Sequence, residues 1–121
     1  MKQVLVVDDS AMIRNIVTLA LKMNNYQVTQ ASNGLEALQK VAETRFDFGI
    51  FDVNMPNISG IELITKVLAT ENGEGMKIVM LTTESGEDMR SQAQNAGARG
   101  WIVKPFENEH LIALLQELEK K

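Results

Sequence analysis

The sequence predicts an α/β protein in which five parallel strands form one sheet with helices on both faces. Five short apolar segments rich in Val, Ile or Phe alternate with five longer segments whose apolar residues recur with the period of a helix. Strict alternation of strands and helices is typical of a parallel sheet covered on both faces. Because 121 residues is the length of one domain, we expect residues 1–121 to form a single folding unit.

The elements follow one another in a regular order along the chain. Strands are predicted over residues 3–7, 27–31, 47–51, 77–81 and 99–103, and helices over residues 10–23, 33–43, 59–71, 86–96 and 107–120. The first and last helices each carry apolar residues at the spacing of a buried stripe, namely Ile13, Ile16, Val17 and Ala20 in the first and Leu111, Leu114, Leu115 and Leu118 in the last.

Helix start and stop signals support these boundaries. Three helices are preceded by a capping residue with an acid three positions later: Asn33 with Glu36, Ser59 with Glu62, and Ser85 with Asp88. Gly97 follows the fourth helix, where a left-handed residue commonly ends a helix. Residues 72–75 form a polar loop between two elements, and we find no domain linker or internal repeat.

Composition narrows the class of protein. The chain has no cysteine, which excludes disulfides and zinc–thiolate sites. A net charge of −4 and 5% aromatic residues argue against nucleic-acid binding, which needs a basic face. No apolar stretch approaches the roughly 18 residues of a membrane span, and none resembles a signal peptide. We therefore expect a cytoplasmic protein that binds other proteins.

Three aspartates end two of the predicted strands. Asp8 and Asp9 follow the apolar residues 4–7, and Asp52 follows residues 49–51. Because ligands of such sheets bind beyond the carboxyl ends of the strands, the three carboxylates are expected in one crevice. Oxygen ligands alone favour Mg²⁺. The alternatives are that Asp9 or Ser10 only caps the first helix and that Asp52 is a turn residue.

Two further polar residues are predicted at the same edge. Thr82 and Lys104 lie at or just past the ends of the fourth and fifth strands. Taken alone, Lys104 could be a solvated surface charge, and Thr82 could bond its own backbone. Beside three carboxylates, the lysine can instead pair with Asp52 or with an anionic group attached to it. Five polar groups on one edge of a sheet predict a site.

Four motifs in order along the chain resemble those of the receiver domains of two-component response regulators, specifically the stand-alone chemotaxis receivers. They are Val6-Val-Asp-Asp-Ser10, Asp52-Val-Asn-Met-Pro56 with Gly60, Leu81-Thr-Thr-Glu84, and Lys104-Pro-Phe106. The resemblance covers the whole chain. It implies a flavodoxin-like, doubly wound sheet of order 2-1-3-4-5 flanked by five helices. In relatives the bond matching Lys104–Pro105 can be cis, which the sequence does not determine.

The resemblance also implies roles for the site residues. Asp52 is the expected phosphoacceptor, attacking a phosphohistidine on a partner histidine kinase. Asp9 and Asp52 are expected to bind Mg²⁺ directly, Asp8 through water, and Asn54 through its backbone carbonyl. Lys104 is expected to neutralise charge on the transferring group. Such a protein catalyses its own phosphorylation and dephosphorylation and is not an enzyme with a separate substrate.

Further residues are assigned to switching and to the lifetime of the phosphoryl group. In the family, Thr82 turns toward the phosphoryl group and an aromatic residue follows it. Trp101 stands where Tyr or Phe is usual, and its alternative role is simple packing. Asn54 and Glu84 occupy the positions that tune access of water to the acyl phosphate.

The expected output is the binding of a target protein in chemotaxis or motility, such as a flagellar motor switch component. Family precedent places this surface on the fourth helix, fifth strand and fifth helix, including Arg90, Gln94, Trp101 and Glu109. We expect no nucleic acid, no membrane and a monomer. Three alternatives are a phosphorelay intermediate that passes the phosphoryl group to a histidine phosphotransfer protein, a metabolic phosphohydrolase and a receiver that binds without phosphorylation. The phosphohydrolase would need a spaced Asp-x-Asp and a cap, neither of which the chain has.

Overall fold

The computed structural model describes residues 1–120, in which five strands alternate with five helices. The strands are β1 (Gln3–Val7), β2 (Gln27–Ala31), β3 (Phe48–Phe51), β4 (Lys77–Thr82) and β5 (Gly100–Val103). The helices are α1 (Ala11–Lys22), α2 (Gly34–Glu43), α3 (Gly60–Leu68), α4 (Glu87–Ala96) and α5 (Asn108–Glu119). All neighbouring strands are parallel, in the order β2-β1-β3-β4-β5, which confirms the expected fold class and strand order.

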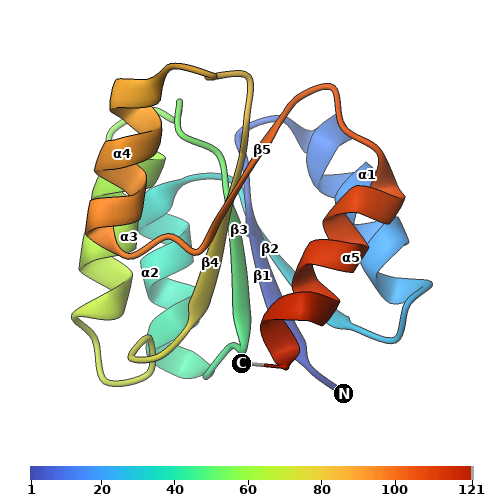
Figure 1. Cartoon of the computed structure of the whole chain (residues 1–121). Coiled ribbons are helices and arrows are strands. Elements are labelled where there is room, and N and C mark those ends of the chain that lie inside the picture. The colour runs from blue at the N-terminus through green and yellow to red at the C-terminus, as the bar shows by residue number, and fades with distance from the viewer. Residues whose placement is uncertain (121) are drawn as a thin grey trace.

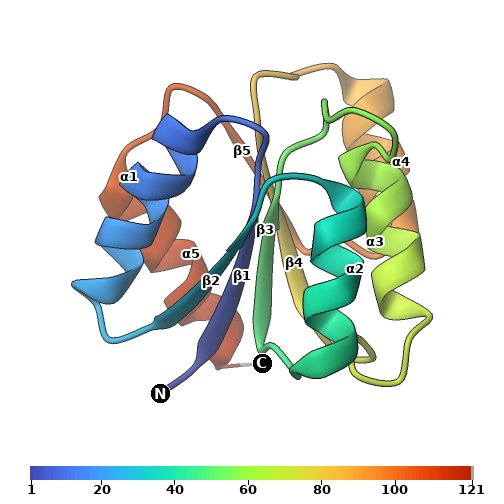
Figure 2. The same cartoon turned by 180° about the vertical axis from the view of Figure 1, so that it is seen from behind.

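The sheet separates two helical layers (Figure 1). Helices α1 and α5 cover one face, and α2, α3 and α4 cover the other, as the reverse view in Figure 2 also shows. Successive residues of β1 point to opposite faces, so Val4 and Val6 pack in the α1/α5 layer while Leu5 and Val7 pack in the other. The sheet is therefore buried on both faces, as expected for a parallel sheet.

The buried stripe of α1 differs from the predicted one. Val17, Ala20 and Leu21 are buried, whereas Ile16 is 43% exposed. With 100° between successive residues, a stripe that includes Leu21 leaves Ile16 at its far margin. The prediction for Ile16 was therefore wrong. In α5 the predicted stripe is confirmed at Leu111, Leu115 and Leu118, which are buried, and Leu114 packs half-buried beside them.

Two of the three predicted N-terminal caps are confirmed. The Asn33 side chain accepts a hydrogen bond from the Glu36 N–H, and Ser59 accepts one from the Glu62 N–H. The prediction for Ser85 was wrong because α4 begins one residue later, with Gly86 as the N-cap and no side-chain capping bond. Gly97 ends α4 with φ of 120°, and its N–H donates to two carbonyls of the last turn, as expected.

The strand register determines which residues share the functional edge of the sheet. Val7 pairs with Ala31 on one side and with Phe51 on the other, so the residues that follow β1 and β3 emerge side by side. The loops that follow the strands all lie at the edge of the sheet opposite the chain termini (Figure 1). Among the described residues, no helix is long and apolar enough to cross a membrane.

Candidate functional site

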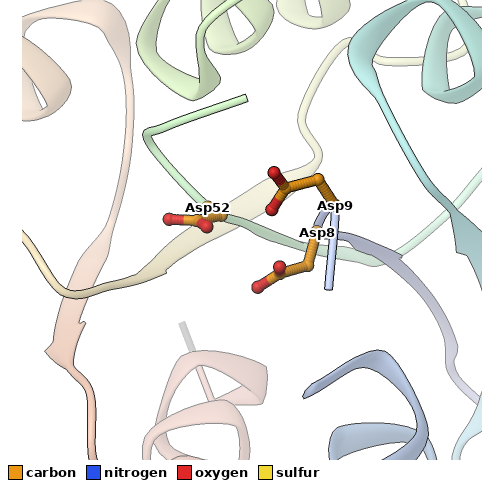
Figure 3. A group of neighbouring side chains, drawn as sticks. All are labelled: Asp8, Asp9 and Asp52. Carbon is orange, nitrogen blue, oxygen red and sulfur yellow. The ribbon is translucent and has the colours of Figure 1, made fainter. Parts of the chain in front are cut away.

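The three predicted aspartates meet at the carboxyl edge of the sheet. Asp8 and Asp9 follow β1, Asp52 follows β3, and one carboxylate oxygen of each lies within 4.8 Å of those of the others. Figure 3 shows the three side chains grouped together, and we call them the acidic cluster. Asp8 is 3% exposed and Asp52 is 7% exposed, whereas Asp9 is exposed to solvent.

Lys104 supplies a positive charge to the acidic cluster. Its Nζ donates to Asp8 Oδ2 at 2.8 Å and to Asp52 Oδ2 at 3.3 Å. Burial alone would lower the pKa of Lys104, but the hydrogen bond to Asp8 and the negative charges of both aspartates outweigh it and raise that pKa. The structure thus brings Lys104 into the site, where the ammonium balances part of the carboxylate charge.

Every polar atom of Asp8 takes part in a hydrogen bond. Its N–H donates to the Ala31 carbonyl at 3.3 Å, and its carbonyl accepts from Arg14 Nη1 at 2.5 Å. Its Oδ1 accepts from the Ser10 N–H at 2.9 Å, and its Oδ2 accepts from Lys104. Ser10 also caps α1 through the Ile13 N–H. A helix cap and a carboxylate cluster therefore coexist in the same turn.

Thr82 ends β4 and is fully buried at this edge. Its Oγ1 accepts a hydrogen bond from the Glu84 N–H at 3.2 Å. This is the local contact with the backbone that the sequence analysis gave as the alternative role of Thr82. A hydroxyl that accepts one hydrogen bond still has its own proton to donate. Thr82 can therefore make this contact and also serve as a donor to an anionic group.

Asn54, Glu84 and Trp101 form a hydrogen-bonded series beside the acidic cluster. Asn54 Nδ2 donates to Glu84 Oε1 at 3.3 Å, and Trp101 Nε1 donates to the backbone carbonyl of Glu84 at 3.0 Å. The half-buried indole is thereby attached to the loop between β4 and α4. Glu84 therefore connects Asn54, the other residue expected to tune dephosphorylation, with Trp101, the residue expected to switch.

The four residues expected to form the partner surface do not share one hollow. Arg90, Gln94 and Trp101 line a hollow of about 140 Å³ together with Arg99. Glu109 instead lines a separate hollow between α1 and α5. The structure thus brings three of these residues together and places Glu109 apart from them.

Two residues near the acidic cluster were not recognised as important for its geometry. A Cβ on Gly60 would lie 1.9 Å from the carbonyl oxygen of Asp52, so only glycine lets α3 begin this close to β3. The sequence motif includes Gly60 without showing the reason. Nothing in the sequence separates Arg14 from an ordinary surface arginine, because its contact with Asp8 arises only when α1 folds back along the sheet.

The donor set of the acidic cluster fits a hard divalent cation. It offers carboxylate oxygens without nitrogen or sulfur, and hard cations such as Mg²⁺ prefer that set. Two of the carboxylates are buried and fixed, and the third faces solvent, from which a hydrated ion can approach. The buried Asp52 beside Lys104 is also a carboxylate that can act as a nucleophile within reach of a positive charge.

Comparison with known proteins identifies relatives along almost the whole chain. Residues 4–116 match the family described as the response regulator receiver domain. The chain is 33% identical over 120 residues to the phosphate regulon transcriptional regulatory protein PhoB of Pseudomonas aeruginosa and 34% identical over 119 residues to the transcriptional regulatory protein ResD of Bacillus subtilis. These alignments cover 99% and 98% of the chain but only 52% and 48% of the relatives, so the chain spans about half their length.

Solved structures match over nearly the full length of both chains. The chemotaxis protein CheY4 of Vibrio cholerae has 42% identity and a TM-score of 0.92, with 97% of this chain and 98% of that chain covered. The receiver domain of the sensor histidine kinase PA1611 of Pseudomonas aeruginosa, solved with a magnesium ion in its active site cleft, has 26% identity and a TM-score of 0.87. That comparison covers 96% of this chain and 95% of that chain.

Proposed function

The chain belongs to the response regulator receiver family, and from that premise we propose that it is a phosphorylation-activated switch whose phosphoacceptor is Asp52. One observation carries the proposal: Asp52 is buried at the carboxyl edge of the sheet, within the acidic cluster and 3.3 Å from the Lys104 ammonium. We also propose that residues 1–121 act as one monomeric receiver domain in the cytoplasm. The likeness to CheY4, a chemotaxis protein, supports a role in chemotaxis or motility.

The proposed reaction transfers a phosphoryl group from a phosphohistidine of a histidine kinase. A carboxylate oxygen of Asp52 attacks the phosphorus atom, the P–N bond breaks, and the imidazole leaves with its bonding electron pair and takes up a proton. Lys104 pairs with the charge of the phosphoryl group, and the Thr82 hydroxyl donates a hydrogen bond to it. The acidic cluster and the Asn54 carbonyl would hold Mg²⁺, which when bound neutralises negative charge on the transferring group.

The hydrogen-bonded series through Glu84 supports the proposed control of the phosphoryl group. Asn54 and Glu84 are placed to influence how water reaches the acyl phosphate, and their mutual hydrogen bond joins the loop after β3 to the loop after β4. The Thr82 hydroxyl accepts a hydrogen bond from the Glu84 N–H, so movement of Thr82 toward the phosphoryl group would pull on the backbone of Glu84. The Glu84 carbonyl accepts the hydrogen bond of Trp101 and would move with it. This provides a direct route from phosphorylation to the indole.

We propose that the phosphodonor docks on the exposed face of α1. Four exposed apolar side chains recur there at a spacing of four and three residues, which suits packing against another helix: Met12, Ile16, Leu19 and Met23. The stripe begins within one turn of the acidic cluster, so a helix lying along it can present its histidine to Asp52.

We propose a different surface for the output partner. Arg90, Arg99 and Trp101 combine two positive charges with an indole around one hollow, which suits a segment that carries acidic and apolar side chains. A target protein such as a flagellar motor switch component is proposed to bind there. The hydrogen bond from Trp101 to Glu84 connects this surface with the phosphorylation site.

The fluorescence of Trp101 tests the proposed chemistry, because it is the only tryptophan in the chain. Mg²⁺ is titrated first, acetyl phosphate is then added, and the wild type is compared with Asp52→Asn. We expect a Mg²⁺ response followed by a change on adding the phosphodonor that only the wild type shows. Mass spectrometry should find one added phosphoryl group on the wild type. Wild-type protein without that added mass after treatment would contradict the proposal.

The lifetime of the phosphoryl group separates the switch from a phosphorelay intermediate. A switch is expected to lose its phosphoryl group to water and to bind its target more tightly in the presence of beryllofluoride, a phosphoryl mimic. A relay would instead return the phosphoryl group rapidly to a histidine phosphotransfer protein. Unchanged target binding by Asp52→Asn, with and without beryllofluoride, would favour a receiver that acts without phosphorylation.

A further inference from the structure

Arg14 contacts the turn of the acidic cluster through its guanidinium, and the guanidinium is itself held from the other side. Arg14 Nη1 donates to the Asp8 carbonyl at 2.5 Å, and Arg14 Nε donates to Gln30 Oε1 at 3.1 Å. Gln30 Nε2 in turn donates to Thr18 Oγ1 at 2.9 Å and to Asn15 Oδ1 at 3.3 Å. Strand β2 and helix α1 thus fix the orientation of a planar donor group that reaches the end of β1.

The exposed aspartate of the acidic cluster lacks comparable support. Among the residues that the structure describes, no hydrogen bond or ion pair holds the Asp9 carboxylate, whereas Asp8 and Asp52 both contact Lys104. The direction of the Asp9 side chain therefore depends on its backbone. The peptide unit that precedes Asp9 is the one whose carbonyl accepts the hydrogen bond from Arg14.

We propose that Arg14 is a positioning residue for the cation site. Its guanidinium, oriented by Gln30, holds the Asp8–Asp9 peptide so that Asp9 faces the other two carboxylates at the separation a small hydrated cation requires. This inference rests on the proposed function of the acidic cluster as a Mg²⁺ site. It assigns no contact between Arg14 and the ion or the phosphoryl group.

The direction in which Mg²⁺ affinity changes when Arg14 is replaced distinguishes a positioning role from an effect of its charge alone. A guanidinium near a cation site repels the ion, so removal of its charge alone would tighten Mg²⁺ binding. Loss of positioning has the opposite effect. It also has a second signature, because Mg²⁺ demands nearly ideal octahedral geometry whereas Ca²⁺ accepts variable geometry. A displaced Asp9 should therefore weaken Mg²⁺ binding more than Ca²⁺ binding, while a change of charge affects the two divalent ions alike.

Calorimetric titration of Mg²⁺ and Ca²⁺ into four variants tests the proposal. Arg14→Met removes the guanidinium. Arg14→Lys keeps the charge but lacks the planar group whose separate Nε and Nη1 donors reach Gln30 and Asp8. Gln30→Leu leaves Arg14 in place without its support. Lys22→Met, in the last turn of the same helix, removes an equal charge far from the site. Circular dichroism sets a temperature at which all the variants are folded.

We expect both Arg14 variants to bind Mg²⁺ roughly tenfold more weakly than the wild type, as is typical when a group supporting metal ligands is lost. The ratio of Mg²⁺ to Ca²⁺ affinity should fall in both. Gln30→Leu should show the same trend to a smaller degree, and Lys22→Met should behave as the wild type.

Two results would overturn the inference. Equal or tighter Mg²⁺ binding by Arg14→Met, with the affinity ratio unchanged, would leave Arg14 only an electrostatic role and would keep the proposed function intact. A wild type that binds neither ion would refute the Mg²⁺ site of the proposed function together with this inference. If Arg14→Met does not fold, Gln30→Leu decides between the outcomes by the same two measurements.

Discussion

Replacement of Lys104 by methionine should destabilise the protein when no divalent cation is present. The Lys104 ammonium lies 2.8 Å from one carboxylate oxygen and 3.3 Å from another, in Asp8 and Asp52 respectively. The side chains of the two aspartates are only 4% and 10% exposed, and that of Lys104 is 12% exposed. Methionine keeps most of the volume and removes the charge, so two buried carboxylates are left without their counter-ion.

The size of the effect follows from that burial. Removing one member of a buried ion pair costs about 3–5 kcal/mol, and the partial exposure of Lys104 favours the lower end, about 3 kcal/mol. For a chain of this length, each kcal/mol corresponds to a shift of about 4 °C in Tm, so we expect Tm to fall by about 12 °C. A bound Mg²⁺ ion would replace the lost positive charge, and excess Mg²⁺ should therefore recover most of the difference.

Thermal and urea unfolding in EDTA and in excess MgCl₂ measures both effects. Lys66→Met is the matched control, because Lys66 is exposed in the last turn of α3 and its loss should cost only about 0.3–1 kcal/mol. If Lys104→Met is as stable as the wild type in EDTA, the ammonium does not balance the two carboxylates and the reasoning fails. If Mg²⁺ stabilises the wild type and not the variant, the two cations do not act on the same charges.

Three further predictions follow from the packing, the charge and the surface of the molecule. Gly60→Ala should lower the free energy of unfolding by at least about 2 kcal/mol, because its Cβ would overlap the backbone at the end of β3. Gly86→Ala is the control and should change that free energy little, because its Cβ would meet open space. Similar midpoints of urea unfolding for the two variants would contradict this prediction. Burial, together with the charge of Glu119 and a hydrogen bond with Glu119, raises the pKa of Tyr26, the only tyrosine, to about 12. The folded state therefore favours the neutral phenol, and this contribution to stability is present below pH 10 and is lost as the pH rises toward 12; phenolate absorbance appearing near pH 10 in folded protein would refute it. Leu19→Glu should slow phosphorylation by a partner histidine kinase at least tenfold while acetyl phosphate labels it normally, and equal slowing with both donors would argue against docking on α1.

The acidic cluster was predictable because its members mark strand ends. Asp8, Asp9 and Asp52 follow apolar runs that end abruptly, and parallel strands bring their carboxyl ends to one edge of the sheet. The alternation of strand and helix segments along the sequence is enough to place these residues on that edge. Distances are not needed for such an inference.

Contacts that cross between elements were not predictable in the same way. The exposure of Ile16 depends on how α1 is rotated on the sheet, which the apolar residues on either side of it leave open. Whether Glu109 shares a hollow with Arg90 depends on the space between α4 and α5. The prediction for Ser85 failed because the backbone at Gly86 also suits the start of a helix.

By itself, the sequence determined the fold class, the edge of the sheet that carries the site, and the kinds of group that meet there. These properties depend on the local period of apolar residues, which defines each element, and on the alternation of strands and helices, which makes the strands parallel. Both can be read along the chain. Only the tertiary structure decided that Lys104 lies nearer to Asp8 than to Asp52 and that Arg14 reaches the turn before Asp9. Each of those contacts joins elements brought together by packing, and side-chain packing selects among orientations that the sequence pattern leaves equal.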